Sequence, residues 1–512
     1  MQRITNKQTK RILLHSSSYL PLFVIVLFFL LIRVSTLSQQ PMFIDEAIYI
    51  RWSQLVLSGT HNWFISLTDG KQPLFIWFSA IALFLVKDPS VAGRYVSVVS
   101  GLFTLVGLFF LTRELFKNST AAYCAALLYA VFPMALVYDR MALYDSVVGT
   151  LSVYSLLFLL FVIRRHSFLW AVALGITWGM AILNKSSGFL LIGLSPLVMV
   201  IFVGGKLFRR SVAFSFFWRF ALACCIALGM YSVLTLSPLF YMIYEKNSLF
   251  VYHLAELIPY NAFVAWPGNM LRMSQWLVTY YTLTFLVALF YAFYCHKTYV
   301  REKIVLLIFF ISPLLLLGLF GRIIHPRFIF FISLFLFPLL GLGVDSVLSL
   351  VRAGKKFGGI VLLFFFLPVV YSSFLILSDF SHAPIPDEDL VQYSNDWPSG
   401  AGMKEMMVFI REQRHEMGTV TLYTEGVYGG LPTTVSQIYF ASDKAVTLVA
   451  FDAVDSELKR ALRHSVAQEP TYIIFNQSQK IPRSLPLILK AQYRNGAGTS
   501  YSRLYEVAKR KG

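Results

Sequence analysis

The sequence predicts a polytopic α-helical membrane protein that carries a small α/β domain at its C-terminal end. Composition is the first indication: of 512 residues, 57% are hydrophobic and 14% are charged, whereas about a quarter of the residues of a soluble protein are charged. The second is a series of apolar runs that are long enough, at about 20 residues, to cross a bilayer as helices. The third is a change to mixed polar sequence after residue 377.

About eleven apolar segments are expected to span the membrane. They are residues 19–37, 91–111, 121–138, 146–163, 168–183, 188–203, 220–236, 271–294, 304–319, 328–348 and 360–377. A further run at 74–86 is short for a span, at about 13 residues, and favours a helix in the membrane interface. It closes a stretch that has apolar residues at helical spacing from Ile44 to Leu55, so we expect interfacial helices in the first outer loop.

Short basic loops set the orientation. If residues 74–86 do not cross, every loop on the side of the basic N-terminus is short and basic, as the cytoplasmic side requires. These loops hold Arg113 and Lys117; Arg164 and Arg165; Lys206, Arg209 and Arg210; Lys297, Arg301 and Lys303; and Arg352, Lys355 and Lys356. The sequence therefore predicts a protein of the cell (inner or plasma) membrane with a cytoplasmic N-terminus. The same loops explain much of the net charge of +18, and no nucleic-acid partner is predicted.

The chain divides into three parts by composition. Residues 1–378 are expected to form the membrane domain, 379–398 a linker rich in Pro, Asp and Ser, and 399–512 an extracytoplasmic α/β domain. In the last part we expect helices at 403–415 and 457–464 and strands at 419–424, 471–475 and 503–507. The glycine-rich segment after Glu425 is not GxGxxG, so it favours a turn.

Isolated charges gather on the predicted outer face. A charge at membrane depth costs about 2.5–3.5 kcal/mol, so a convergent set indicates a functional site. The candidates are Asp45, Glu46, Lys71, Asp139, Arg140, Asp145, Lys185, Arg322, His325 and Arg327. The acids at 45 and 46 either cap a helix, or one caps it while the other accepts a proton as a general base.

Each of the other candidates has two interpretations. The lysines at 71 and 185 either reach toward headgroups or, with Arg322, His325 and Arg327, hold a phosphate. The acids and the arginine at 139, 140 and 145 either form a local salt bridge or contact substrate. No cofactor is firmly indicated, and a divalent metal ion is a candidate, with Glu46, His253 and Glu256 as candidate ligands although their spacing fits no tight motif.

Five motifs make the membrane half resemble the superfamily C (GT-C) glycosyltransferases, in particular the protein O-mannosyltransferase, lipid A aminoarabinose transferase and bacterial family 39-like group. The motifs are FIDEAIYIRWSQLVLSG, GKQPLFIWF, VYDRMALYDS, LNKSSGFL and HPRFIFF, in that order. The resemblance implies a polyprenyl-phosphate sugar donor, a hydroxyl acceptor on the outer face and inversion at the anomeric carbon. Many relatives have a glutamate directly before the lysine of the second motif, whereas this chain has DGKQP, and a metal site that uses that glutamate is therefore in question.

Carried over residue by residue, the resemblance implies a role for each candidate. Asp45 is the base and Glu46 supports it or helps to bind a metal, while Arg140 and Asp145 line the cavity. The lipid phosphate is held by Lys71, Lys185 and Arg327.

The function predicted is a hexosyl- or pentosyltransferase that works on a lipid, glycan or protein acceptor. The main alternative is a transporter or flippase of lipid-linked saccharides, for which broken mid-membrane helices in two matching halves are expected. The third reading is an outer-face scaffold, which leaves the one-sided cluster of charges unexplained.

Overall fold

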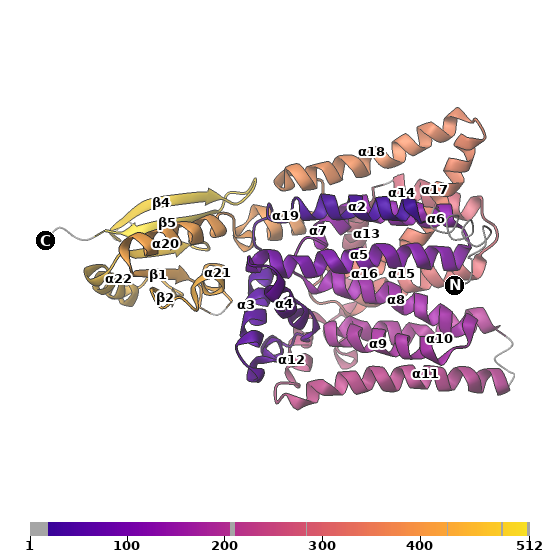
Figure 1. Ribbon diagram of the computed structural model, residues 1–512, viewed down its shortest axis with the longest axis horizontal. Helices are drawn as coiled ribbons and strands as arrows, with labels where there is room; N and C mark the ends of the chain where they lie inside the picture. The colour runs from indigo at the N-terminus through magenta and orange to yellow at the C-terminus, as the bar shows by residue number, and fades with distance from the viewer. Residues whose placement is uncertain (1–18, 205–209, 283, 428, 483–484, 509–512) are drawn as a thin grey trace, which may run out of the picture.

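The computed structural model describes residues 19–204, 210–282, 284–427, 429–482 and 485–508. The molecule is elongated, with a bundle of long helices and, at one end of the bundle, a five-stranded sheet flanked by helices (Figure 1). This is the architecture that the sequence predicts, a polytopic helical membrane protein with a small C-terminal α/β domain.

Seven helical segments in the described part of the chain are long and apolar enough to cross a membrane. They are α5 (Pro89–Phe116), α8 (Tyr144–Arg165), η3 with α10 (Ser186–Val203), α11 (Arg210–Tyr231) with η5 (Ser232–Leu236), α15 (Val300–Phe320), the run from η7 to α17 (Pro326–Arg352) and α18 (Lys356–Ser378). An eighth span is formed if α13 (Ala262–Tyr281) and α14 (Thr284–Tyr294) are counted together, with a bend of 92° between them.

Three shorter apolar helices account for the remaining expected spans: α2 (Leu20–Val34), α6 (Ser119–Val131) and α9 (Phe168–Asn184). Helix α6 ends just before Pro133, which cannot donate a backbone hydrogen bond, and the chain continues as α7 (Pro133–Tyr138). Within the bundle, α8 packs against both α5 and α9, and α6 packs against α17. Every segment expected to span the membrane therefore contains a helix.

The segment between α2 and α5, expected to be the first outer loop, contains two further helices. Helix α3 (Ile44–Ser58) and helix α4 (Leu74–Leu85) pack against each other and lie at the end of the bundle nearest the sheet (Figure 1). With 12 residues, α4 is about 18 Å long, which is short of the ~30 Å hydrocarbon core. Its length therefore agrees with an interfacial helix.

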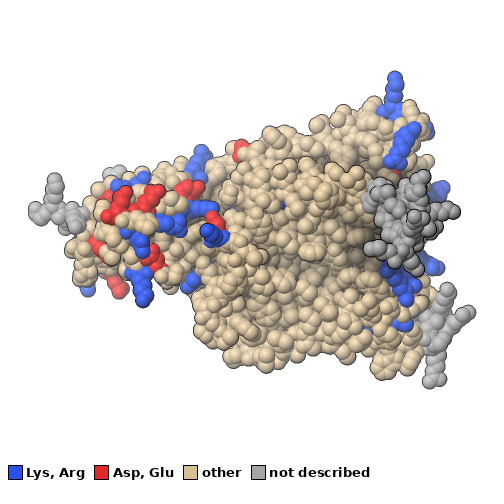
Figure 2. Space-filling model, in the orientation of Figure 1, with Lys and Arg blue, Asp and Glu red and all other residues tan. Residues whose placement is uncertain are grey.

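Charged side chains divide the surface into bands. Figure 2 shows a wide middle zone that is almost free of charge, a sheet domain with both signs, and an opposite end whose charges are mostly Lys and Arg. The loop of Arg164 and Arg165 at the end of α8 belongs to that opposite end, and Lys206 and Arg209 lie outside the described residues. A charge-free band between two charged ends is typical of a protein that spans a bilayer.

The C-terminal sheet has the strand order β2-β1-β3-β5-β4. Strands β2 (Val446–Phe451), β1 (Val420–Glu425) and β3 (Thr471–Phe475) are parallel, and β5 (Tyr501–Val507) and β4 (Leu487–Arg494) complete the sheet as an antiparallel hairpin. Helices α20 (Met403–Met417), α21 (Leu431–Phe440) and α22 (Ser456–Gln468) accompany it. The turn expected after Glu425 is present, because Gly426 and Gly429 have positive φ and lead into α21.

The α/β domain contacts the membrane bundle through α3. Helix α21 packs on α3, and the Gln54 Nε2 atom donates to the Ile438 carbonyl oxygen at 2.9 Å. The expected linker is a packed segment of short helical turns: η9 (Phe380–His382), α19 (Asp387–Leu390), η10 (Val391–Asn395) and η11 (Trp397–Ser399). The helix that starts with Asp45 therefore lies between the bundle and the α/β domain.

Candidate active site

Glu46 is buried in an ion pair at the start of α3. Arg94 on α5 donates from Nε and Nη2 to the two Glu46 oxygens, each at 2.9 Å. The backbone N–H groups of Phe43 and Ala142 donate to the same carboxylate at 3.0 and 2.7 Å. These four donors use both oxygens of the carboxylate that caps α3, so the expected help of Glu46 in binding a metal has no support in this geometry. Its other expected role, to support Asp45, stays a prediction.

Asp45, one residue earlier, faces a different environment. Its Oδ2 atom accepts from Arg327 Nη1 at 2.8 Å, and its side chain is 27% exposed against 12% for Arg327. The Arg327 guanidinium also lies over the rings of Phe43 and Phe328, each 5.7 Å away. This arginine is charged at all working pH values, so it holds the Asp45 carboxylate by a charged hydrogen bond.

The two lysines of the outer loops lie near this pair. Lys185 Nζ donates to Asp145 Oδ1 at 2.7 Å, and Lys71 Nζ lies 4.9 Å from the centre of the Phe250 ring. Burial lowers the pKa of Lys71, while the charge of Asp45 raises it and that of Arg327 lowers it. We call Lys71, Lys185 and Arg327 the cationic cluster.

The backbone brings the two lysines together. Lys71 follows Gly70, whose φ of 65° suits glycine, and a Cβ at Gly70 would lie 2.6 Å from the Met242 carbonyl oxygen. Next to Lys71, Gln72 Nε2 donates to Ser186 Oγ at 2.6 Å, and Asn247 Nδ2 donates to the same hydroxyl at 2.9 Å. One serine, next to Lys185 in sequence, therefore joins three outer segments.

His325 borders the cationic cluster, and Arg322 belongs to a separate group. The His325 Nδ1 atom accepts from Gln392 Nε2 at 2.8 Å. Burial and the charge of Arg327 lower the pKa of His325 to about 4, so the imidazole is neutral at pH 7. Arg322 pairs with Glu256 at 2.8 Å and lies over the Tyr252 ring, so its expected part in phosphate binding has no support in this geometry.

The expected metal ligands are used in local contacts. Glu256 accepts from the His253 backbone N–H at 2.7 Å, and the His253 ring stacks on Tyr244 with 4.5 Å between ring centres. Among the residues that the structure describes, no three His, Cys, Asp or Glu side chains are grouped as a metal site requires.

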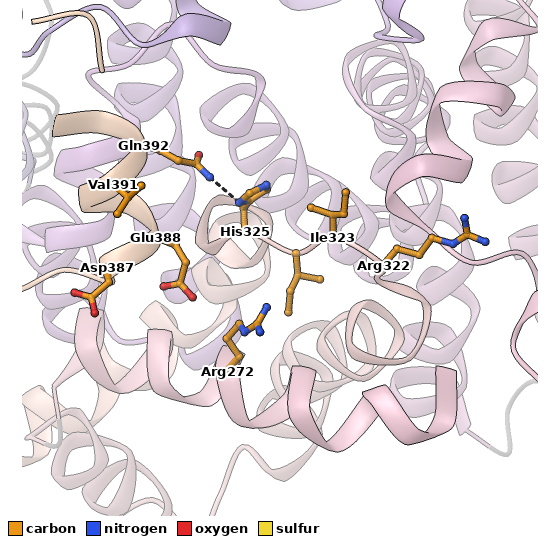
Figure 3. A pocket seen from close by; sticks show the side chains of 9 residues that line it. Arg272, Arg322, Ile323, His325, Asp387, Glu388, Val391 and Gln392 are labelled. Carbon is orange, nitrogen blue, oxygen red and sulfur yellow. Dashed lines mark hydrogen bonds between the residues drawn. The ribbon is translucent and has the colours of Figure 1, made fainter. Parts of the chain in front are cut away.

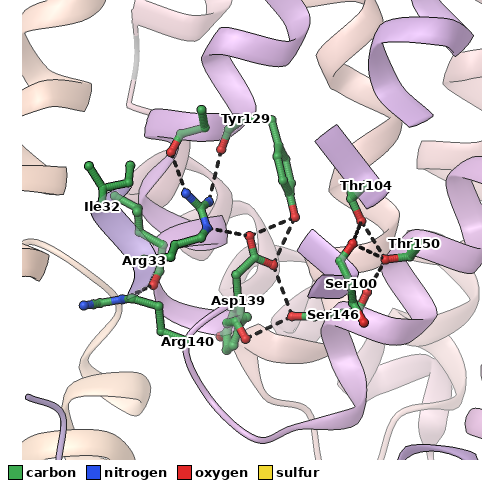
Figure 4. Close-up of polar contacts among 12 residues, drawn as sticks. Ile32, Arg33, Ser100, Thr104, Tyr129, Asp139, Arg140, Ser146 and Thr150 are labelled. Atoms are coloured by element: carbon green, nitrogen blue, oxygen red, sulfur yellow. Dashed lines mark hydrogen bonds and ion pairs between the residues drawn. The ribbon is translucent and has the colours of Figure 1, made fainter. Parts of the chain in front are cut away.

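The second outer loop differs from the sequence prediction. Asp139 pairs with Arg33 of α2 at 3.0 Å and accepts from the Tyr129 hydroxyl, while the Arg140 guanidinium points away from Asp139 (Figure 4). Arg140 is buried and donates to Thr36 Oγ1 at 2.8 Å and to backbone carbonyl oxygens. Asp139 and Arg140 therefore bind partners far away in sequence, and the local salt bridge, one of the two interpretations of this loop, is not formed between them. The expected part of Arg140 in lining the cavity stays a prediction that these contacts do not support.

Comparisons with known proteins bear on the fold. A family model described as dolichyl-phosphate-mannose-protein mannosyltransferase matches residues 70–231. No curated protein sequence matches the chain. The solved structure of ArnT from Cupriavidus metallidurans in the apo state covers 95% of this chain and 98% of its own, with a TM-score of 0.56 and 14% identity.

Two further structures give the same result. ArnT from Cupriavidus metallidurans bound to undecaprenyl phosphate has a TM-score of 0.58 at 12% identity, covering 95% of this chain and 98% of its own. The Archaeoglobus fulgidus oligosaccharyltransferase in the apo form has a TM-score of 0.54 at 14% identity, over 89% of this chain and 69% of its own. The chain has the GT-C glycosyltransferase fold.

The GT-C resemblance expected from the sequence motifs is thus confirmed at the level of the fold. In this GT-C fold the structure brings together Asp45, Lys71, Asp145, Lys185, His325 and Arg327. It places Glu46, Arg140, Arg322, His253 and Glu256 in other contacts. The family match includes both lysines of the cationic cluster but neither Asp45 nor Arg327.

Sequence reasoning missed Arg94, which holds Glu46. This arginine is the single charged residue in the apolar run 91–111, and an isolated charge in a span usually has a buried partner, so the signal was present. It also missed Gln72, Ser186 and Asn247, whose hydrogen bonds no spacing rule indicates.

Proposed function

We propose that the protein transfers a sugar from a polyprenyl-phosphate donor to an acceptor hydroxyl at the outer face of the cell membrane, with inversion at the anomeric carbon. The observation that carries the proposal is the Asp45 carboxylate, partly exposed and held by Arg327 beside two further cations. A glycosyltransferase needs both parts: a base for the acceptor and cations for the phosphate that leaves.

The chemical step follows from these groups. The acceptor oxygen attacks the anomeric carbon and gives its proton to Asp45, which contributes on the order of 10²–10⁴ in rate as a placed general base. The bond between the anomeric carbon and the phosphate oxygen breaks, and its electron pair leaves with polyprenyl phosphate. The phosphate gains negative charge in this step, which the cationic cluster of Lys71, Lys185 and Arg327 stabilises.

Asp145 is proposed to keep Lys185 in place, since the two form a 2.7 Å ion pair at one side of the cluster. Asp45 plays the same part for Arg327 between turnovers. The ArnT structure that matches this chain is bound to undecaprenyl phosphate, which supports a lipid phosphate as the ligand of the cluster.

The site is proposed to lie at the outer face of the cell membrane. The N-terminus and the basic loops are cytoplasmic, and the α/β domain beyond the linker is extracytoplasmic. The basic end of the molecule in Figure 2 supports this orientation, because cytoplasmic loops carry an excess of Lys and Arg.

The test is turnover of the purified protein with polyprenyl-phosphate sugars that differ in the sugar. Release of free polyprenyl phosphate is expected from at least one donor, slowly with water as acceptor and faster with a hydroxyl acceptor. If no donor is cleaved while the intact lipid crosses the bilayer of a reconstituted vesicle, the protein is a transporter and the proposal fails.

A further inference from the structure

A pocket of about 540 Å³ lies beside His325, outside the cationic cluster (Figure 3). It is formed by α13, by the segment that precedes η7 (Pro326–Ile329), and by the linker turns α19 and η10. Its charged lining is two arginines, Arg272 and Arg322, and two acids, Asp387 and Glu388, and His325 and Gln392 add neutral polar groups.

Several polar atoms around this pocket have capacity for a ligand. Glu388 accepts from Trp276 Nε1 at 3.0 Å through Oε2, and its carboxylate lies beside Arg272 in Figure 3. Gln392 Oε1 is buried and has no hydrogen-bond partner within the described residues. The Arg272 guanidinium points toward the space between Glu388 and His325 (Figure 3), and it forms no ion pair with any described residue.

Asp389 anchors the linker, which carries Glu388 and Gln392, to the helix bundle. The Asp389 carboxylate is fully buried and accepts from the Tyr138 hydroxyl at 2.6 Å and from the Tyr280 hydroxyl. Tyr138 ends α7 and Tyr280 lies in α13, so two helices of the bundle fix α19. Asp389 points into the bundle, and its neighbour Glu388 lines the pocket.

The pocket and the cationic cluster suit different ligands. The pocket lining holds two arginines and two carboxylates, and Arg322 is already paired with Glu256. A phosphate in the pocket would therefore meet two acids beside the one arginine that has no ion pair among the described residues, whereas the cluster offers three cations. Hydroxyl groups both donate and accept, so they match a lining that has free acceptors at Glu388 and Gln392 and a free donor at Arg272. Ile323 and Ile324 supply an apolar surface for the C–H face of a sugar ring.

We propose that this pocket binds a neutral saccharide, the acceptor of the transfer. The inference rests on the proposed function, because it gives the same site its acceptor. His325 connects the pocket with the cationic cluster. It lines the pocket, and the charges of Asp45 and Arg327 act on its imidazole. His325 therefore joins the pocket to the residues around Asp45.

Direct binding is the first test, and it requires no donor. Purified full-length protein is mixed with 4-nitrophenyl glycosides of mannose, glucose, galactose and N-acetylglucosamine, and binding is followed by saturation-transfer NMR. At least one glycoside is expected to bind, and Glu388→Gln and Arg272→Gln are expected to raise its Kd about tenfold, the equivalent of one charged hydrogen bond. The control is Glu412→Gln, an exposed acid on α20, which leaves the Kd unchanged.

A third variant controls for an effect of misfolding on binding. Gln392→Ala removes the buried acceptor without a change of charge, and it is expected to weaken the same glycoside while the Tm stays near that of the wild type. If no glycoside binds, or if all three variants bind it as the wild type does, the saccharide assignment is overturned. A serine- or threonine-containing peptide that binds in place of the glycosides, and that Glu388→Gln weakens, also overturns it and makes the acceptor a protein.

Kinetics separate the pocket from the donor site. With a donor that the wild type hydrolyses, Glu388→Gln and Arg272→Gln are expected to keep the rate of hydrolysis and to raise the KM for the bound glycoside about tenfold. A loss of hydrolysis together with transfer contradicts the pocket's separate role. If glycosides bind but no donor is ever cleaved, the proposed function fails while the saccharide pocket stands.

Discussion

Asp45 and Glu46 are neighbours in sequence with opposite surroundings. Successive residues of a helix point about 100° apart, so the first turn of α3 directs Glu46 toward Arg94 and Asp45 toward Arg327. The sequence left open which acid caps the helix. The structure gives the cap to Glu46, which leaves Asp45 partly exposed for a substrate.

If the cationic cluster binds the lipid phosphate, loss of one of its charges should weaken that binding. Removal of one charged donor costs about 1.5–3 kcal/mol, so Lys185→Ala and Arg327→Ala are expected to weaken undecaprenyl phosphate binding roughly 10- to 100-fold. Arg327→Lys keeps the charge but loses the planar fork, and an intermediate affinity is expected. The measurement is equilibrium binding in detergent.

Arg411→Gln, an exposed arginine of α20 outside the cluster, is the matched control and should bind the lipid as the wild type does. Unchanged affinity in both Lys185→Ala and Arg327→Ala would show that the phosphate lies elsewhere.

The Glu46–Arg94 pair predicts a stability effect. Arg94→Met leaves the buried Glu46 carboxylate without its cation, which typically costs about 3–5 kcal/mol, so a clear fall in Tm is expected. In the double variant Glu46→Gln with Arg94→Met, no buried charge is left unpaired, and a smaller fall is expected. Thermal unfolding of the purified variants measures both, and a double variant that loses as much as the two single variants together would contradict a direct pair.

At the scale of elements, the segment expected as a linker has structure that its composition did not indicate. It forms short helical turns that pack on the bundle. The reason is tertiary: Asp389 binds hydroxyls of Tyr138 and Tyr280, which lie 251 and 109 residues away. Composition contains no information about partners at such distances.

Asp389 predicts how stability changes with pH. Burial raises its pKa from 3.8 to about 7, although the hydrogen bonds from the tyrosines lower it. The folded state therefore holds a proton that the unfolded state releases near pH 4, so this contribution is complete below pH 4 and disappears as the pH rises through 7. The wild-type Tm is expected to fall between pH 6 and 8.5, and that of Asp389→Asn to fall less.

The control is Asp387→Asn, an exposed acid on the same short helix α19, which should keep the wild-type pH dependence. Equal falls of Tm in Asp389→Asn and the wild type would mean that Asp389 is already ionised at pH 6.

The other elements were predictable where their periodicity is strong. The spans follow from apolar length, and β1 and β3 from short buried apolar runs. The sequence interpretation missed α21, β2 and β4. Helix α21 begins with Leu-Pro-Thr-Thr, whose β-branched threonines disfavour a helix, and β4 is mostly exposed, so its pattern lacks a buried face.

At the scale of the molecule, the site lies where three parts meet: the bundle, the first outer loop and the α/β domain. The candidate residues come from positions 45 to 327, so only the fold could show which of them converge. The charge pattern of the sequence distinguished the candidate site residues from the short basic loops. It could not distinguish the cationic cluster from Arg140 and Arg322, which bind Thr36 and Glu256 instead.

The proposed orientation has a direct test. With the four native cysteines replaced by serine, Glu412→Cys on α20 is expected to react with a membrane-impermeant maleimide in intact cells. Lys355→Cys, in the loop before α18, is expected to react only after permeabilisation, because positive loops remain in the cytoplasm. The reverse pattern would place the site on the inner face.

The central claim is that Asp45 takes the proton of the acceptor. It is tested by comparing wild type, Asp45→Asn and the control Glu245→Gln, an exposed outer acid, in release of polyprenyl phosphate from a donor sugar lipid. Asp45→Asn is expected to lose at least about a hundredfold in kcat while it still binds the donor, and Glu245→Gln to behave as the wild type. Turnover of Asp45→Asn at the wild-type rate would contradict the account.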